Sequence, residues 1–254
     1  MTTMQMILIV CPLVFLASFV DSIAGGGGLI SLPAFMLTGM PVHMACGSNK
    51  FSACAGSIIS AVRFYKNGKM HVLGAVISGI LALAGAAIGS KLNLMIDSST
   101  LKKIFLIILP VVAVFVLFGG NSRRRKTLLE GKKLYLSCAL IGFFIGAYDG
   151  LIGPGTGTFM IFCYTTFVGF DYVTASGNAK VANLSSNFAS MVLYLFAGQI
   201  LFSVTVPAAI CCICGGWLGS GMAIQKGSKF IKAMLIVVLI GIFGKLIWDL
   251  HLFG

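Results

Sequence analysis

Two stretches of the chain place a carboxylate beside a glycine-rich break in apolar sequence. Residues 21–29 read D-S-I-A-G-G-G-G-L, and residues 149–157 read D-G-L-I-G-P-G-T-G. Glycine runs and proline do not continue a helix cheaply. The helix that follows each break begins with free backbone N–H groups, which attract anions. The anion-binding residues predicted in the two breaks are Gly25, Gly26, Gly27, Gly28, Gly153, Gly155, Thr156 and Gly157.

A second pair of motifs places a lysine inside each of two apolar segments. Residues 47–50 read G-S-N-K, and residues 177–180 read G-N-A-K. An ammonium group within a membrane is costly and usually faces a polar cavity or a partner. Asparagine and serine side chains donate directional hydrogen bonds to an oxyanion. The sequence therefore adds Ser48, Asn49, Lys50, Asn178 and Lys180 to the predicted site.

The same lysines have a competing interpretation as structural charge pairs. Lys50 would pair with Asp149, and Lys180 with Asp21, so that each buried charge is neutralised. The two interpretations are compatible if anion binding rearranges the pairs. Burial also makes both aspartates candidates for proton coupling.

A membrane-embedded chain is required to position these residues. The 254 residues are 58% hydrophobic and 9% charged, with a mean hydropathy of +1.03, whereas about a quarter of a soluble domain is charged. We predict an all-α integral membrane protein, because about 20 apolar residues span a bilayer as a helix. The predicted helical runs are 4–20, 29–38, 43–62, 71–90, 101–119, 134–148, 156–168, 173–197, 201–222 and 230–250. The runs 29–38 and 156–168 are too short to span comfortably.

The chain contains an internal duplication. At an offset of 128, Phe15, Asp21, Gly25 and Gly27 match Phe143, Asp149, Gly153 and Gly155. From residue 39 the offset becomes 130 and holds as far as Leu109, so that Gly47 and Lys50 match Gly177 and Lys180. We predict two membrane repeats, residues 1–120 and 134–254, joined by a basic cytoplasmic linker at 121–133. Each repeat would hold a broken or re-entrant first element and three further helices.

Loop charge favours opposite orientations of the two repeats. Arg63, Lys66, Lys69, the 123–133 cluster and Lys226, Lys229 and Lys232 all fall on the cytoplasmic side of an inverted arrangement. Only Lys91, Lys102 and Lys103 fall on the other side. The net charge of +12 is thus an orientation signal with possible lipid headgroup contact, and it does not indicate nucleic-acid binding. The expected location is the inner (plasma) membrane, with multiple passes.

Several other features suggest no chemistry. The eight cysteines lie in apolar runs and are expected to pack as small hydrophobes. His43, His71 and His251 are scattered, so no metal site or other cofactor is expected. Asn183 and Asn187, one helical turn apart, could extend a polar lining or serve as packing contacts. The sequence offers no nucleophile and base, so an intramembrane enzyme is the weakest alternative.

The paired motifs resemble those of the sulfite exporter TauE/SafE family of membrane permeases. The resemblance covers nearly the whole chain and rests on Asp21 with Gly25–Gly28 and Pro33, residues 47–50, and their counterparts at 149–157 and 177–180. It implies an ATP-independent plasma-membrane carrier of sulfite, sulfonates or related anions. We therefore expect a secondary transporter that works by alternating access, with an anion channel as the alternative. Neither the motifs nor the resemblance selects the anion, the direction, the coupling ion or the oligomeric state.

Overall fold

The computed structural model describes the backbone of residues 1–119 and 127–252, and their side chains except those of 109, 110, 112–119, 228 and 231–252. The basic residues 123–126 of the predicted linker lie outside the described residues. The regular structure of the described chain is all helical, without strands, which confirms the predicted all-α class. Its elements are α1 (Thr3–Ala24), α2 (Gly28–Met36), α3 (Val42–Lys66), α4 (Val72–Met95), α5 (Ser98–Gly119), α6 (Gly131–Leu151), α7 (Thr156–Cys163), a π-helical turn η1 (Tyr164–Val168), α8 (Tyr172–Phe196) and α9 (Phe202–Leu252).

Four of the described segments are long and apolar enough to cross a membrane: α1, α4, α6 and the Phe202–Gly227 part of α9. The backbone of α9 leaves the helical region at Gly227, with φ 71°, so that two successive helices follow one another there. This agrees with the separate runs predicted on either side of residue 227.

Both first elements are broken, as predicted. α1 ends at Ala24 and α2 begins at Gly28, whereas α6 ends at Leu151 and α7 begins at Thr156. α2 and α7 are only 9 and 8 residues long, too short to span a bilayer.

Side-chain caps define where several helices begin. Thr2 and Gln5 form a reciprocal capping box at the start of α1. The Asp171 carboxylate accepts hydrogen bonds from the backbone N–H groups of Val173 and Thr174 at the start of α8. Asp97 does the same for α5, and hydrogen bonds from Thr100 and Ser99 hold the pKa of its exposed carboxyl well below the usual range.

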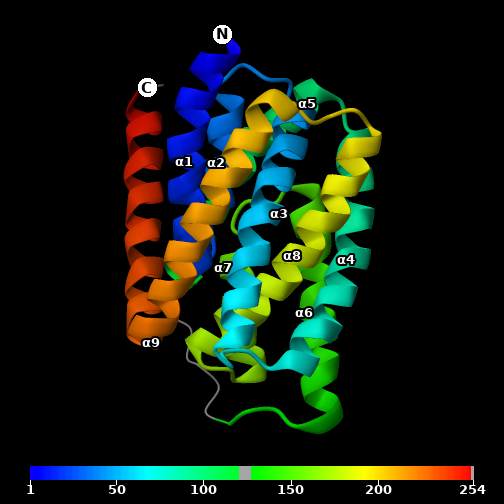
Figure 1. The fold of residues 1–254 in the computed structure, drawn as a ribbon, viewed down its shortest axis with the longest axis vertical. Helices are drawn as coiled ribbons and strands as arrows, with labels where there is room; N and C mark the ends of the chain where they lie inside the picture. Colours follow the sequence, from blue (N-terminus) through cyan, green and yellow to red (C-terminus); the bar gives the residue numbers. More distant parts are fainter. Residues whose placement is uncertain (120–126, 253–254) are drawn as a thin grey trace.

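The two halves pack through equivalent interfaces. α6 lies against α4, α1 lies against α9, and α3 and α8 pack on each other between them (Figure 1). A Cβ atom at Gly85 of α4 would overlap the carbonyl oxygen of Phe143, and one at Gly215 of α9 would overlap that of Phe15. These four positions are related by the sequence repeat. Each half therefore docks its broken element onto the third long helix of the other half.

The elements begin and end at opposite poles of the bundle. α1 begins and α9 ends at one pole, and α6 begins at the opposite pole (Figure 1). The end of α3 and the break in α9 lie at the same pole as the start of α6. The described basic residues of this pole are Arg63, Lys66, Lys69, Lys132, Lys133, Lys226 and Lys229.

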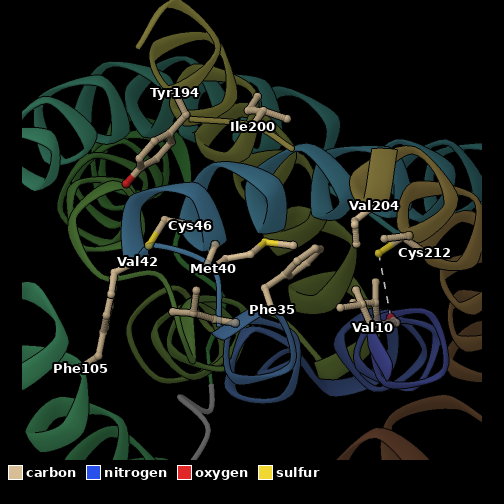
Figure 2. Close-up of a cluster of buried hydrophobic side chains, with 14 of the residues drawn as sticks. Val10, Phe35, Met40, Val42, Cys46, Phe105, Tyr194, Ile200, Val204 and Cys212 are labelled. Carbon is tan, nitrogen blue, oxygen red and sulfur yellow. Dashed lines mark hydrogen bonds between the residues drawn. The ribbon is translucent and has the colours of Figure 1, made fainter. Parts of the chain in front are cut away.

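An apolar cluster ties α1, α2, α3, α5, α8 and α9 together. Phe35 lies at its centre, facing Met40 from the loop after α2 (Figure 2). The dashed line in Figure 2 marks a weak hydrogen bond of 3.9 Å from the thiol of Cys212 in α9 to the carbonyl oxygen of Val14 in α1. Cys46 and Cys212 are buried in this cluster, where a thiol packs as a small hydrophobic group. The cluster holds α2 in place against the long helices.

Candidate functional site

A cavity of about 50 Å³ lies where the two broken elements meet in the interior of the bundle. One buried water needs about 10–15 Å³ of such volume, so the cavity has room for a few waters or for a small oxyanion. Its polar and charged lining residues are Ser18, Asp21, Ser31, Asn49, Lys50, Ser57, Asp149, Thr156, Asn183 and Asn187.

The two breaks contact each other directly beside this cavity. A Cβ atom at Gly25 would overlap the backbone of Gly157 and Thr158, and one at Gly157 would come within 2.8 Å of the Gly25 Cα. Gly25 also has φ 74°, a conformation that costs a residue with a side chain. Thr158 adds a hydrogen bond of 3.2 Å from its hydroxyl to the carbonyl oxygen of Ala24. Glycine thus permits two backbone segments of different repeats to meet at the site.

The first charge pair joins α3 to the end of α6. The Nζ of Lys50 lies 2.8 Å from Oδ2 of Asp149 and donates a second bond of 2.7 Å to the main-chain oxygen of the same residue. Asp149 accepts two further hydrogen bonds, from the hydroxyls of Thr156 (2.8 Å) and Ser186 (2.6 Å). The two side chains are 7% and 4% exposed, so this pair is buried and its carboxylate has several donors.

The second charge pair joins α8 to α1. Lys180 contacts Oδ2 of Asp21, and the backbone N–H of Gly27 lies 3.2 Å from the other carboxylate oxygen. The lysine is 1% exposed, whereas the Asp21 side chain is 21% exposed. The repeat thus produces both of the charge pairs considered from the sequence, with different surroundings.

Most of the predicted site residues line this one cavity, although they come from both repeats. They are Gly26, Gly27, Gly28, Asn49, Lys50, Gly153, Gly155, Thr156 and Gly157, together with the two aspartates.

The remaining predicted residues lie beside the cavity or away from it. Lys180 contacts Asp21 but does not itself line the cavity, and Gly25 is covered by the first turn of α7. The hydroxyl of Ser48 accepts a hydrogen bond of 3.2 Å from the backbone N–H of Leu201, and the side-chain oxygen of Asn178 accepts one of 2.8 Å from that of His71.

The last two bonds are equivalent in the two repeats, because both residue pairs are related by the offset of 130. Each one fastens the first turns of α3 or α8 to the loop before the third long helix of the other half. Successive residues of a helix point about 100° apart, so Ser48 faces the neighbouring loop while Asn49 and Lys50 face the cavity.

Some lining residues carried little signal in the sequence. Asn183 and Asn187 follow Lys180 at helical spacing and both line the cavity, so their spacing was informative. Ser31 and Ser57 had no feature that separates them from serines used in helix packing. Two of the predicted residues have a buried side-chain atom without a hydrogen-bond partner in the described structure: Oδ1 of Asn49 and Nδ2 of Asn178.

A family model for the sulfite exporter TauE/SafE matches residues 10–246. The chain belongs to the TauE/SafE family. It is 35% identical over 238 residues to a probable membrane transporter protein of Haemophilus influenzae, with 92% of each chain covered. It is also 31% identical over 241 residues to the probable membrane transporter protein YfcA of Escherichia coli K12, with 93% of this chain and 87% of the relative covered.

A third TauE/SafE relative is the probable membrane transporter protein ORF9 of a Sinorhizobium species, 31% identical over 235 residues. The alignment covers 92% of this chain and 90% of the relative. No solved structure matches the chain at a significant level. Family membership and the apolar helices together make this protein a multi-pass membrane transporter.

Proposed function

We propose that the protein is a secondary transporter that moves a small anion across the inner (plasma) membrane by alternating access. The anion would be sulfite, an organosulfonate or a related sulfur oxyanion. One observation supports this most strongly: both glycine breaks and the ammonium group of Lys50 face the same small cavity inside the bundle. Broken helices at matching places in two repeats commonly form the substrate site of a transporter.

The lining of the cavity suits an anion. Irregular backbone survives at membrane depth only where protein buries it or a polar cavity faces it. The breaks at 26–28 and 153–157 present such backbone to the cavity. The N-terminus of each following short helix, which is the positive end of its dipole, therefore lies at the cavity. Asn49 adds a side-chain amide to the lining, and the N–H groups of an amide can donate hydrogen bonds to an oxyanion.

We propose further that the two repeats are inverted with respect to the membrane. Three observations support this: the equivalent interfaces α4–α6 and α1–α9, the opposite poles at which α1 and α6 begin, and the basic residues at the pole of the linker. The basic pole would then face the cytoplasm. Rocking of the two halves about the shared cavity would expose it to each side in turn.

Flux into proteoliposomes tests this proposal. We expect saturable uptake of one or more labelled anions from a panel of sulfite, thiosulfate, sulfonates and carboxylates, and we expect unlabelled anion on the opposite side to accelerate it. Current that rises linearly with voltage, without such exchange, would identify a channel. A reproducible chemical product would identify an enzyme. Absence of flux for the whole panel would contradict anion transport.

A lysine substitution tests the proposed site. Lys50→Gln is expected to raise the half-saturating anion concentration at least tenfold, because the substitution removes the ammonium group from the cavity. Lys103→Gln is the matched control, since Lys103 is exposed on α5. Gel filtration of the purified variants checks that both remain folded. Unchanged transport by folded Lys50→Gln would exclude Lys50 from anion binding.

A further inference from the structure

We propose that Asp21 is the proton-binding residue of the transport site, and that its protonation releases Lys180 to the entering anion. This inference rests on the proposed function. It gives the two repeat-related aspartates different roles. Asp21 binds a proton and releases Lys180 during transport, whereas Asp149 stays paired with Lys50 and stabilises the site.

The charges around the cavity explain why a proton is needed. Two ammonium groups and two carboxylates meet there, so the described groups of the site sum to zero formal charge. An additional anion would bring an uncompensated charge into a buried site, which is strongly unfavourable. One proton on a carboxylate makes the site net positive. A monovalent anion, such as hydrogen sulfite or a sulfonate, then leaves the protonated site neutral.

Exposure and hydrogen bonding distinguish the two carboxylates. Asp149 is 4% exposed and accepts from Lys50 and two hydroxyls. Asp21 is 21% exposed, lines the cavity, and accepts from one side chain and one backbone N–H at 3.2 Å. Protonation of Asp149 would weaken three side-chain contacts, whereas protonation of Asp21 weakens one. Water in the cavity also reaches Asp21 more readily.

The two lysines also differ in the number of hydrogen-bond acceptors that hold them. Lys50 keeps the main-chain oxygen of Asp149 as a second acceptor at 2.7 Å. For Lys180, Asp21 is the acceptor recorded in the described structure. Because Asp21 both contacts Lys180 and lines the cavity, loss of its charge leaves Lys180 with an ammonium group that requires a new acceptor. An oxyanion in the cavity supplies that acceptor.

The groups that face Asp21 are few within the described residues. Lys180 of α8 contacts it, and Lys50 of α3, Asp149 of α6 and the thiol of Cys212 from α9 share the cavity with it. α2 and α7 contribute only backbone and hydroxyl groups there. In the proposed step a proton from the aqueous phase binds Oδ2 of Asp21, the Asp21–Lys180 pair opens, and a Lys180–anion pair replaces it. No covalent bond to the anion changes.

The experiment uses the full chain in proteoliposomes that contain a pH-sensitive dye, with ³⁵S-labelled sulfite as the probe and protein-free vesicles to subtract leak. The wild-type protein is expected to accumulate sulfite above equilibrium when a proton gradient is imposed, with protons moving in the same direction. Asp21→Asn is expected to retain sulfite exchange but to lose gradient-driven accumulation and the accompanying proton movement. Asp21→Glu is expected to restore both.

Two further variants separate the possible outcomes. In Lys180→Met, sulfite affinity is expected to fall and to lose its dependence on pH, which a merely structural role would not produce. Asp149→Asn is expected to lower stability while any remaining transport stays proton-coupled.

Gradient-driven accumulation by Asp21→Asn would overturn the assignment of Asp21 but leave anion transport intact. Loss of coupling only in Asp149→Asn would transfer the role to Asp149. Absence of sulfite exchange in the wild type would remove the support for both this inference and sulfite as the substrate.

Discussion

Removal of the Lys50 charge is expected to destabilise the protein more than removal of any exposed lysine. In Lys50→Met, the carboxylate of Asp149 stays buried at 4% exposure and keeps only the hydroxyls of Thr156 and Ser186 as side-chain donors. Loss of one partner of a buried ion pair costs about 3–5 kcal/mol. With 1.36 kcal/mol for each factor of ten, this corresponds to an increase in the unfolding equilibrium constant of about 10²- to 10⁴-fold.

The second charge pair supplies an internal comparison. In Lys180→Met the unpaired carboxylate is that of Asp21, which is 21% exposed and faces the cavity. Water there compensates part of the lost interaction, so we expect a smaller loss of about 1.5–3 kcal/mol, typical of one charged hydrogen bond. The double variant Lys50→Met/Asp149→Asn should recover at least half of the loss of Lys50→Met, because it leaves no unpaired charge.

Reversible unfolding in mixed detergent micelles measures these free energies at neutral pH, with Lys103→Met as the exposed control. Two results would refute the reasoning. If Lys50→Met were as stable as the control, the pair would contribute nothing to the fold. If the double variant were no more stable than the single variant, the loss would come from side-chain packing and not from the unpaired carboxylate.

Two other predictions concern contacts that the repeat produces twice. Gly85→Leu and Gly215→Leu should each destabilise the fold by roughly 1–3 kcal/mol or more, because the added side chain overlaps a backbone carbonyl of the neighbouring helix. Ala84→Leu, at an exposed position of the same helix, should change the same unfolding free energy little. Ser48→Ala and Asn178→Ala should each cost about 1–2 kcal/mol by removing a hydrogen-bond acceptor from a backbone N–H. Their half-saturating anion concentrations in the flux assay should stay near the wild-type value; a large increase would place these side chains at the substrate.

The sequence alone determined the helices, the breaks and the duplication. Apolar composition and the positions of glycine and proline are local properties of the sequence. In a membrane they determine where helices form and break, because every backbone polar group there must be hydrogen-bonded within the protein. The runs 4–20 and 71–90 correspond to α1 and α4, with ends shifted by a few residues. The short runs 29–38 and 156–168 correspond to α2 and to α7 with η1. The same reasoning identified Asp21 and Asp149 beside the breaks.

Only the tertiary structure decided which of these residues share a cavity. Ser48, Asn49 and Lys50 are adjacent in the sequence, yet Ser48 holds a loop while the other two line the cavity. The two lysine motifs are equivalent in sequence, but Lys50 lines the cavity and Lys180 does not. The sequence offered both charge pairs as one of two interpretations, and packing between segments that are 99 or 159 residues apart decided that both pairs form. No local pattern encodes that packing, so the exposure and polarity of each site became visible only in the folded chain.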